Sequence, residues 1–323
     1  MKLTILAAAA AISASALAAQ AQELKFANFT PPFHTINASV IEKMNADLSA
    51  ATGGEVTVRG YHGGELGAGP VEQYVRVVQG AADLAWGLQG YTSSQFQKTM
   101  IMELPGVVPK GMSGADAYCK VYNEIAGEFP ATVPVAIWAS EPNVMIMRDK
   151  VIREPGDLGG LKIRVAGATA GKVAEALGAT PVQMPISQVY NALENGLIDG
   201  VFTGASTLND FKLDEVAHAF TLGASLGHLG FYTVLNEGVY NNLPDAAKEA
   251  LSAEYRCELS NNAETQWNAT ADAGVARARG DDKNTFVDLT PEQAAAFDAL
   301  TTPVMQAYVD EVGGQSVLDA LQN

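Results

Sequence analysis

The sequence predicts an α/β protein of two lobes, each a mostly parallel sheet flanked by helices, with one long helix that spans both lobes. Strand-like and helix-like segments alternate from Glu23 onward. A helix that leads through Gly, two residues and Asp into an apolar strand occurs twice, in GAADLAWG at 80–87 and in GLIDGVFTG at 196–204. The chain contains no proline from 245 to about Arg279. This proline-free stretch is far longer than an average helix of about 11 residues. We therefore expect two similar lobes, and a helix long enough to reach from one to the other.

Local signals support the individual elements. Thr30 and Pro31 are typical of the cap and first position of a helix, and apolar residues at 71, 74, 75 and 78 have the spacing of an amphipathic helix. Near the C-terminus, Thr290 and Pro291 predict a helix over 291–312. The elements of the first part are expected in this order: strand 24–29, helix 34–50, strand 55–61 and helix 71–78.

The N-terminal residues predict export. Met1 and Lys2 precede an apolar run that is too short to span a bilayer, and Ala19, Gln20 and Ala21 form an A-x-A cleavage site before Gln22. No later stretch approaches the roughly 18 apolar residues of a membrane helix. We expect a signal peptide at 1–21, cleavage after Ala21, a periplasmic location and no insertion into the membrane.

The charge balance excludes some partners. The chain has a net charge of −16, which becomes −17 without Lys2 and which repels nucleic acids and anionic lipids. An anionic ligand would therefore have to be captured by local groups. The two cysteines, Cys119 and Cys257, are compatible with a disulfide in an oxidising compartment and equally with two buried thiols.

Patterns that resemble enzyme motifs lack the required context. GASLG at 223–227 matches G-x-S-x-G around Ser225, but a β-rich run follows it where a nucleophile elbow needs a helix. GATAGKV at 167–173 has three residues between its glycines where a phosphate-binding loop has four. The helix start at Gly167 still suits an anion. The histidines show no metal-ligand spacing, so we expect no catalytic site, metal or cofactor.

Arg164 is the most unusual residue of the predicted strands. It lies near the C-terminal end of LKIRV at 161–165, where ligands bind in open α/β sheets. Six basic and three acidic residues occur between Arg148 and Lys172, so this segment is positive within an acidic chain. A guanidinium can hold a carboxylate through two parallel hydrogen bonds. The pattern alone leaves two explanations for Arg164, an internal acidic partner or an anionic ligand.

Several motifs resemble those of one family. LKFANF, YHGGELG, VVQGAADLAW and DLGGLKIRVAG are joined by LGATPVQMPISQVYNALENGLIDGVFTG. Together they resemble the DctP-like solute-binding proteins of tripartite ATP-independent periplasmic (TRAP) transporters, over nearly the whole mature chain. The resemblance implies a periplasmic binding-protein fold that closes on a small organic acid like a clamshell. It also implies delivery to the permease subunits in the membrane, a monomer, and a strand arginine, here Arg164, that pairs with the ligand carboxylate.

The resemblance also suggests lobe boundaries and a pocket. Lobe I is expected at 22–141 and 229–268, and lobe II at 142–228 and 269–323, with the cleft between them. The predicted ligand-binding residues are Arg164, Thr203, Gln89, Tyr91, Trp86, Phe29, Phe202, His34, Ile186 and Gly167.

Two departures from the family narrow the expected ligand. Many members carry a second arginine and an asparagine at the positions that, by alignment of the motifs, correspond to Val144 and Thr203 here. A second anionic group on the ligand is therefore not expected, and the aromatic residues at the strand ends favour a monocarboxylate with an apolar or aromatic body. Two alternatives stay open at this point: a binding protein of the ABC type for an organic anion, and a periplasmic hydrolase that uses Ser225.

Overall fold

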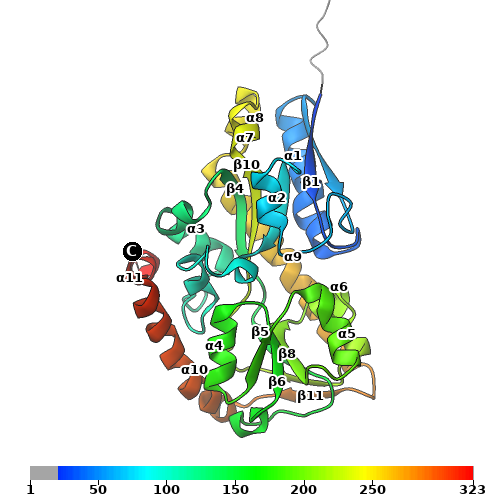
Figure 1. Ribbon diagram of the computed structural model, residues 1–323, viewed down its shortest axis with the longest axis vertical. Coiled ribbons are helices and arrows are strands. Elements are labelled where there is room, and N and C mark those ends of the chain that lie inside the picture. The colour runs from blue at the N-terminus through cyan, green and yellow to red at the C-terminus, as the bar shows by residue number, and fades with distance from the viewer. Residues whose placement is uncertain (1–20, 323) are drawn as a thin grey trace, which may run out of the picture.

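Two sheets, one in each lobe, form the framework of the protein (Figure 1). The computed structural model describes residues 21–322, so the predicted signal peptide lies, apart from Ala21, outside the described residues. The first sheet has the strand order β2-β1-β3-β10-β4 and the second has the order β11-β9-β5-β8-β6-β7. This arrangement confirms the predicted two-lobed α/β fold.

The elements of the first lobe alternate between strands and helices along the chain. Its strands are β1 (Gln22–Ala27), β2 (Val56–Tyr61), β3 (Leu84–Leu88), β4 (Thr132–Ala139) and β10 (Gly230–Asn236). Its helices are α1 (Lys43–Ala51), which follows a π-helical turn at Asn37–Glu42, then α2 (Gln73–Val78), α3 (Gly114–Ile125), α7 (Glu237–Asn241) and α8 (Asp245–Ala250).

The second lobe is built in the same way. Its strands are β5 (Asn143–Met147), β6 (Lys162–Val165), β7 (Thr180–Gln183), β8 (Gly200–Gly204), β9 (Ala219–Leu222) and β11 (Thr285–Asp288). Its helices are α4 (Ala168–Ala176), α5 (Val189–Glu194) and α6 (Thr207–Asp210), and α10 (Pro291–Val312) packs on α4.

Each sheet contains antiparallel as well as parallel pairs, because one of its strands starts where a loop, 140–142 or 223–229, brings the chain in from the other lobe. β5 and β10 begin after these two loops and run away from the boundary between the lobes, whereas β4 and β9 end at the loops, and β3 and β8 also end at the boundary. β10 is therefore antiparallel to β3 and β4, and β5 is antiparallel to β8 and β9. The remaining pairs are parallel, with their carboxyl ends at the boundary between the lobes.

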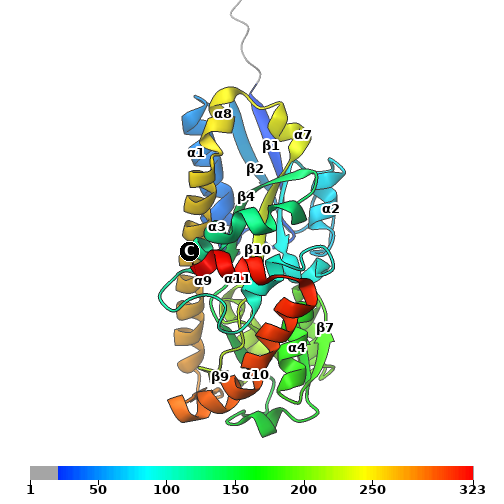
Figure 2. The same ribbon diagram turned by 90° about the vertical axis from the view of Figure 1, so that its left-hand side faces the viewer.

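The long helix α9 (Ala253–Arg279) connects the cores of both lobes. Figure 2 shows it running along one edge of the molecule. Trp267 packs into the core of the first lobe, and Ala271 and Ala278 pack into that of the second. The proline-free segment after Pro244 thus forms α8 and α9, separated at Ser252, whose side chain caps α9.

The C-terminal helices correct one part of the predicted lobe boundaries. α10 has the predicted bounds, with Thr290 in a capping box. The next helix, α11 (Gln315–Gln322), packs against α3, and its Val317 and Leu321 belong to a core cluster of the first lobe (Figure 1). The assignment of 269–323 to the second lobe is therefore wrong for α11, because α10 leads the chain back across the boundary. We keep the other predicted boundaries as a proposal.

A disulfide joins α3 to α9 within the first lobe. Cys119 and Cys257 are bonded with their Cα atoms 5.9 Å apart, which decides between the two states that the sequence left open. Among residues 21–322, no helix has the length and apolar character of a membrane span.

Candidate ligand-binding site

A cavity lies between the lobes, where β1, β3, β6 and β8 end. The space inside it that the centre of a water molecule can reach is about 30 Å³, and the cavity extends beyond this space on every side by the radius of a water molecule. The site therefore suits a compact ligand. The lining residues are Phe29, His34, Trp86, Leu88, Tyr91, Ser140, Arg164, Ile186, Thr203, Gly204, Ser206, Thr207, Phe211, Leu229, Phe231 and Trp267.

Arg164 supplies a buried positive charge to this cavity. Its neighbours Ile163 and Val165 point into the core on one face of β6, so the alternation of the strand places Arg164 on the other face. The side chain is fully buried, and its Nε donates a hydrogen bond of 2.9 Å to the Met184 carbonyl. Nη1 and Nη2 have no hydrogen-bond partner within the described chain.

The charge of Arg164 has no acidic partner among residues 21–322 at ion-pair distance. Burial lowers the pKa of the guanidinium, and the adjacent Tyr91 opposes this shift. A guanidinium nevertheless stays protonated in proteins. A buried charge without a partner costs several kcal/mol, so the two free nitrogens favour an anion in the cavity.

Two hydroxyl groups lie around the guanidinium. Tyr91 follows β3 in the first lobe, and its oxygen accepts a hydrogen bond of 3.0 Å from the Ile186 amide of the second lobe. Burial raises the pKa of Tyr91, so the phenol keeps its proton and can donate it to a ligand. Thr203 lies on β8, beside β6, and its buried Oγ1 has no partner in the described residues. A carboxylate between these groups would meet four N–H or O–H donors.

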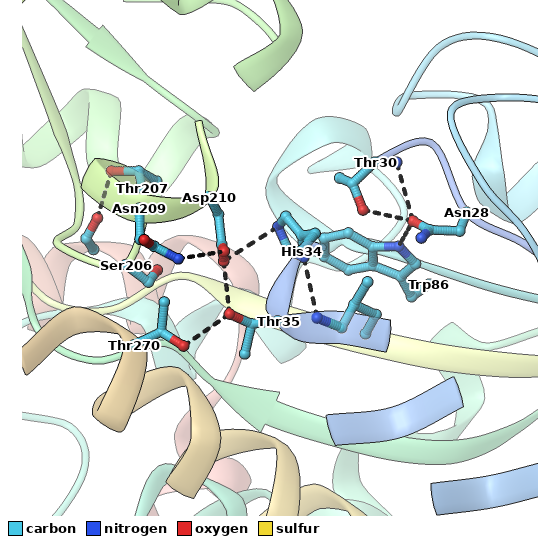
Figure 3. Close-up of polar contacts among 12 residues, drawn as sticks. Asn28, Thr30, His34, Thr35, Trp86, Ser206, Thr207, Asn209, Asp210 and Thr270 are labelled. Carbon is cyan, nitrogen blue, oxygen red and sulfur yellow. Dashed lines mark hydrogen bonds and ion pairs between the residues drawn. The ribbon is translucent and has the colours of Figure 1, made fainter. Parts of the chain in front are cut away.

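Aromatic rings form much of the remaining wall. Phe29 and Trp86 are stacked, with centroids 4.6 Å apart and planes inclined by 17°. Trp86 Nε1 donates a hydrogen bond of 2.9 Å to Asn28 Oδ1 (Figure 3), so the polar atom of the indole is already satisfied. Phe231 and Trp267 pack against the same ring. This wall can bury an apolar body but offers few polar contacts.

His34 and Asp210 lie on opposite sides of the cleft. His34 Nδ1 accepts a hydrogen bond from the Ile36 amide, and Nε2 is 3.6 Å from Asp210 Oδ2 (Figure 3). Burial lowers the pKa of His34 to about 3, so the ring is neutral near pH 7. Thr35 Oγ1 donates a hydrogen bond of 2.8 Å to Asp210 Oδ2 and contacts Thr270 of α9. This network joins both lobes and the long helix beside the cavity.

The lobes also meet through backbone. A Cβ atom at Gly167 would lie 2.6 Å from Gly90 Cα, and the Ala168 amide donates a hydrogen bond of 3.2 Å to Ser93 Oγ. Gln183 Nε2 donates to the Gly90 carbonyl at 3.4 Å. The structure is therefore the closed arrangement of the lobes.

Seven of the ten predicted site residues line the cavity, and three do not. The seven are Phe29, His34, Trp86, Tyr91, Arg164, Ile186 and Thr203. Phe202 points to the opposite face of β8 and packs in the core, because neighbours in a strand alternate. The Gln89 amide donates to the Phe231 carbonyl behind the wall. Gly167 contacts Gly90 and does not reach the cavity. We carry none of these three into the proposed site.

Sequence reasoning missed other lining residues. Ser206 and Thr207 follow the end of β8, so the strand-end rule that selected Thr203 was able to find them. Trp267 lies in α9 and Phe211 after α6, and no local pattern marks either as part of a pocket. Val144 pairs with Thr203 across β5 and β8 but lines a separate groove.

The enzyme-like motif is not assembled into a catalytic site. The Ser225 amide donates to Asp298 Oδ1 at 3.2 Å, and His228 Nδ1 is 2.9 Å from the Ser140 carbonyl. No hydrogen bond joins Ser225 to a histidine in the described part of the chain, and Ser225 lines the separate groove with Val144. Residues 21–322 contain no cluster of three or more metal-ligating side chains.

Comparison with known proteins places the chain among transport proteins. Residues 26–311 match the family model of the bacterial extracellular solute-binding proteins, family 7, named DctP. The C4-dicarboxylate-binding periplasmic protein DctP of Rhodobacter capsulatus is 30% identical over 174 residues, which cover 50% of this chain and 49% of that protein. The matched stretch thus spans about half of this relative.

Solved structures match over nearly the whole chain. A TRAP periplasmic solute-binding protein from Bordetella bronchiseptica with bound (R)- and (S)-mandelate is 25% identical, with a TM-score of 0.83 over 93% of this chain and 97% of that one. A marine metagenome TRAP protein specific for aromatic acids, with 3-hydroxybenzoate, is 26% identical, with a TM-score of 0.85 over 94% and 97%. With the family model matching most of its length, this chain belongs to the DctP family of TRAP solute-binding proteins.

Proposed function

We propose that this protein binds a small monocarboxylate with an aromatic or apolar body in the periplasm and delivers it to the permease subunits of a TRAP transporter. The observation that carries the proposal is Arg164, a fully buried guanidinium whose Nη1 and Nη2 have no partner in the described chain and which lines the cavity between the lobes. A carboxylate would compensate this charge through two parallel hydrogen bonds.

The wall of the cavity supports the apolar part of the ligand. Arg164 is the one Lys or Arg side chain among the described lining residues, so a second carboxylate would be buried without a cation, at a cost of several kcal/mol. Phe29, Trp86 and Trp267 offer ring faces instead. The relatives that bind mandelate and 3-hydroxybenzoate are consistent with this ligand class.

Closure would couple binding to transport. Tyr91 and Arg164 come from different lobes, so a ligand that contacts both is held best by the closed form. A ligand shifts a conformational equilibrium only by such a difference in affinity. Membership of the family supports the periplasmic location and the membrane partner.

A thermal-shift screen tests this function. The series contains benzoate, mandelate and 3-hydroxybenzoate, with succinate and glucuronate for comparison. We expect an aromatic monocarboxylate to raise the Tm most, because a ligand at 100 times its Kd stabilises the folded state by about 2.7 kcal/mol. A shift with succinate or glucuronate and none with the aromatic acids would refute the proposed ligand class.

A further inference from the structure

Glu103 is a buried acid that lies at the junction of the lobes and outside the ligand cavity. The residue is 4% exposed. It is the last residue of the helical turn Thr99–Glu103 in the first lobe. Oε2 accepts a hydrogen bond of 2.8 Å from Thr169 Oγ1 of α4 in the second lobe. Oε1 accepts one of 3.0 Å from the Gly230 amide at the start of β10. One carboxyl group therefore joins both lobes and one connection between them.

The surroundings of Glu103 suit a neutral carboxyl better than a charged one. No Lys or Arg forms an ion pair with Glu103 in the described chain. Gln89 Oε1 and the Tyr118 hydroxyl are buried without a hydrogen-bond partner. Both lie beside Gly230, since a Cβ atom there would collide with them. A protonated Glu103 would have hydrogen-bond acceptors in this cluster, and the charged form has no cation.

We propose that closure of the lobes takes up a proton at Glu103, so that the protein holds its ligand more tightly as the pH falls from 8.5 to 6.5. This inference rests on the proposed function, since it concerns regulation of the same site. In the open form Thr169 moves away with the second lobe and water reaches the carboxyl group. In the closed form water is excluded, and the neutral carboxyl is favoured.

The direction of the pH dependence follows from the linkage between proton binding and closure. Burial raises the pKa of Glu103 to about 7 in the closed form, and the hydrogen bonds from Gly230 and Thr169 only partly oppose the shift. A hydrated glutamate has a pKa of about 4.3. The closed form therefore binds more protons, and its advantage is present below pH 7 and is lost as the pH rises through this value. The difference corresponds to about fourfold tighter binding at pH 6.5 than at pH 8.5.

Other titratable groups near Glu103 do not interfere in this range. Tyr118 of α3 and Tyr308 of α10 interact with it electrostatically, and burial raises the pKa of both phenols, so they stay neutral. From the 223–229 connection, the His228 amide donates a hydrogen bond to the backbone carbonyl of Glu103. This contact does not involve the carboxyl group. Burial lowers the pKa of the His228 ring.

Asp210 also accepts a hydrogen bond across the lobes, from Thr35. Its contribution to the pH dependence of binding is smaller than that of Glu103, and His34 opposes it. Burial raises the pKa of Asp210 to about 6, against opposing contributions from Thr35 and Lys212, and Glu141 interacts with it. His34 acts in the opposite direction, because burial in the closed form lowers its pKa to about 3. Opening would return His34 towards its ordinary pKa of about 6.5. Burial also raises the pKa of Glu141, in the connection between β4 and β5, to about 7, so a variant of Glu103 is needed to assign the proton uptake to this residue.

Calorimetry at several pH values tests the proposal on the full mature chain. The probe is benzoate, or mandelate if benzoate gives no shift in the screen, and both remain ionised throughout. The Kd is measured at pH 6.5, 7.5 and 8.5, in pairs of buffers with different ionisation enthalpies, which gives the number of protons taken up on binding. We expect proton uptake near pH 7.5 and about two- to threefold tighter binding at pH 6.5 than at pH 8.5, because His34 offsets part of the fourfold contribution of Glu103.

Two variants locate the effect. Glu103→Gln keeps the shape of the protonated acid and should remove the proton uptake near pH 7.5 and the tighter binding at pH 6.5. Glu128→Gln is the matched control, since Glu128 also accepts hydrogen bonds from a threonine hydroxyl and backbone amides, but only from Lys98 and Thr99 of its own lobe. It should behave as wild type.

The outcomes separate the two proposals. Binding with the same Kd at all three pH values, or with proton release, overturns the role of Glu103 and leaves the proposed function standing. An unchanged pH dependence in Glu103→Gln also overturns it. If this variant does not fold, the proton count of the wild type still decides. Absence of binding at every pH refutes the proposed function and this inference with it.

Discussion

At the scale of single residues, the donors around the cavity would allow a chain with a net charge of −16 to retain the proposed anion. Long-range steering opposes the approach of an acid, so the attraction must come from groups that act at contact distance. Arg164 and Thr203 provide such groups from neighbouring strands, and Tyr91 adds one from the other lobe. Their burial makes each hydrogen bond stronger than it would be in water.

Thr203→Val tests whether its hydroxyl contacts the carboxylate. The substitution keeps the shape of the side chain and removes one donor, and hydrogen bonds to charged groups contribute about 1.5–3 kcal/mol. We expect the Kd for benzoate to rise about tenfold or more in calorimetry, with no loss of stability without ligand, because Oγ1 has no hydrogen-bond partner among residues 21–322. An unchanged Kd would exclude Thr203 from the site.

Single residues also show how far sequence can predict the site. Arg164 and Thr203 were found because charge and strand ends are local signals. Phe202 was wrongly included beside Thr203, although neighbouring residues of a strand point to opposite faces and Phe202 packs in the core. Trp267 was missed because its place in the cavity depends on how α9 crosses both lobes. That crossing is a property of the whole fold.

At the scale of elements, the start of α4 meets the turn after β3 across the boundary between the lobes. Gly167 precedes α4 with an extended backbone at φ −156°, a conformation open to any residue. A side chain there would meet Gly90 across the cleft. The glycine is therefore needed for the closed arrangement and not for the local backbone.

Gly167→Ala should impair closure without impairing folding. We expect at least tenfold weaker binding of benzoate, because Cβ would lie 2.6 Å from Gly90 Cα, with little change in the Tm of the ligand-free protein. Gly127→Ala is the control, since a Cβ atom at Gly127 meets nothing within 4 Å. Equal affinity of both variants and the wild type would show that the Gly90–Gly167 contact is not required for binding.

Elements differ in how well the sequence predicts them. α10 has its predicted bounds because Thr290 and Pro291 mark its start locally. The direction of β10 was not predicted, since it depends on the return of the chain from the other lobe. The position of α11 on α3 likewise results from long-range packing.

At the scale of the whole molecule, closure brings together groups that the sequence separates widely. Arg164, Tyr91 and Trp267 come from β6, from the turn after β3 and from α9, and they line one cavity only when the lobes meet. The disulfide between Cys119 and Cys257 lies within the first lobe, so it leaves the movement between the lobes free. In the proposed function, binding and closure are one event, and Arg164 is the electrostatic anchor of the ligand.

Calorimetry of benzoate and of uncharged benzyl alcohol, with wild type and Arg164→Met, tests this account most directly. The wild type should bind benzoate and not benzyl alcohol. Arg164→Met should fold and weaken benzoate binding about 30-fold or more, since loss of one partner of a buried charge pair costs about 2 kcal/mol or more. An equal Kd for benzoate in both proteins would contradict the central role of Arg164.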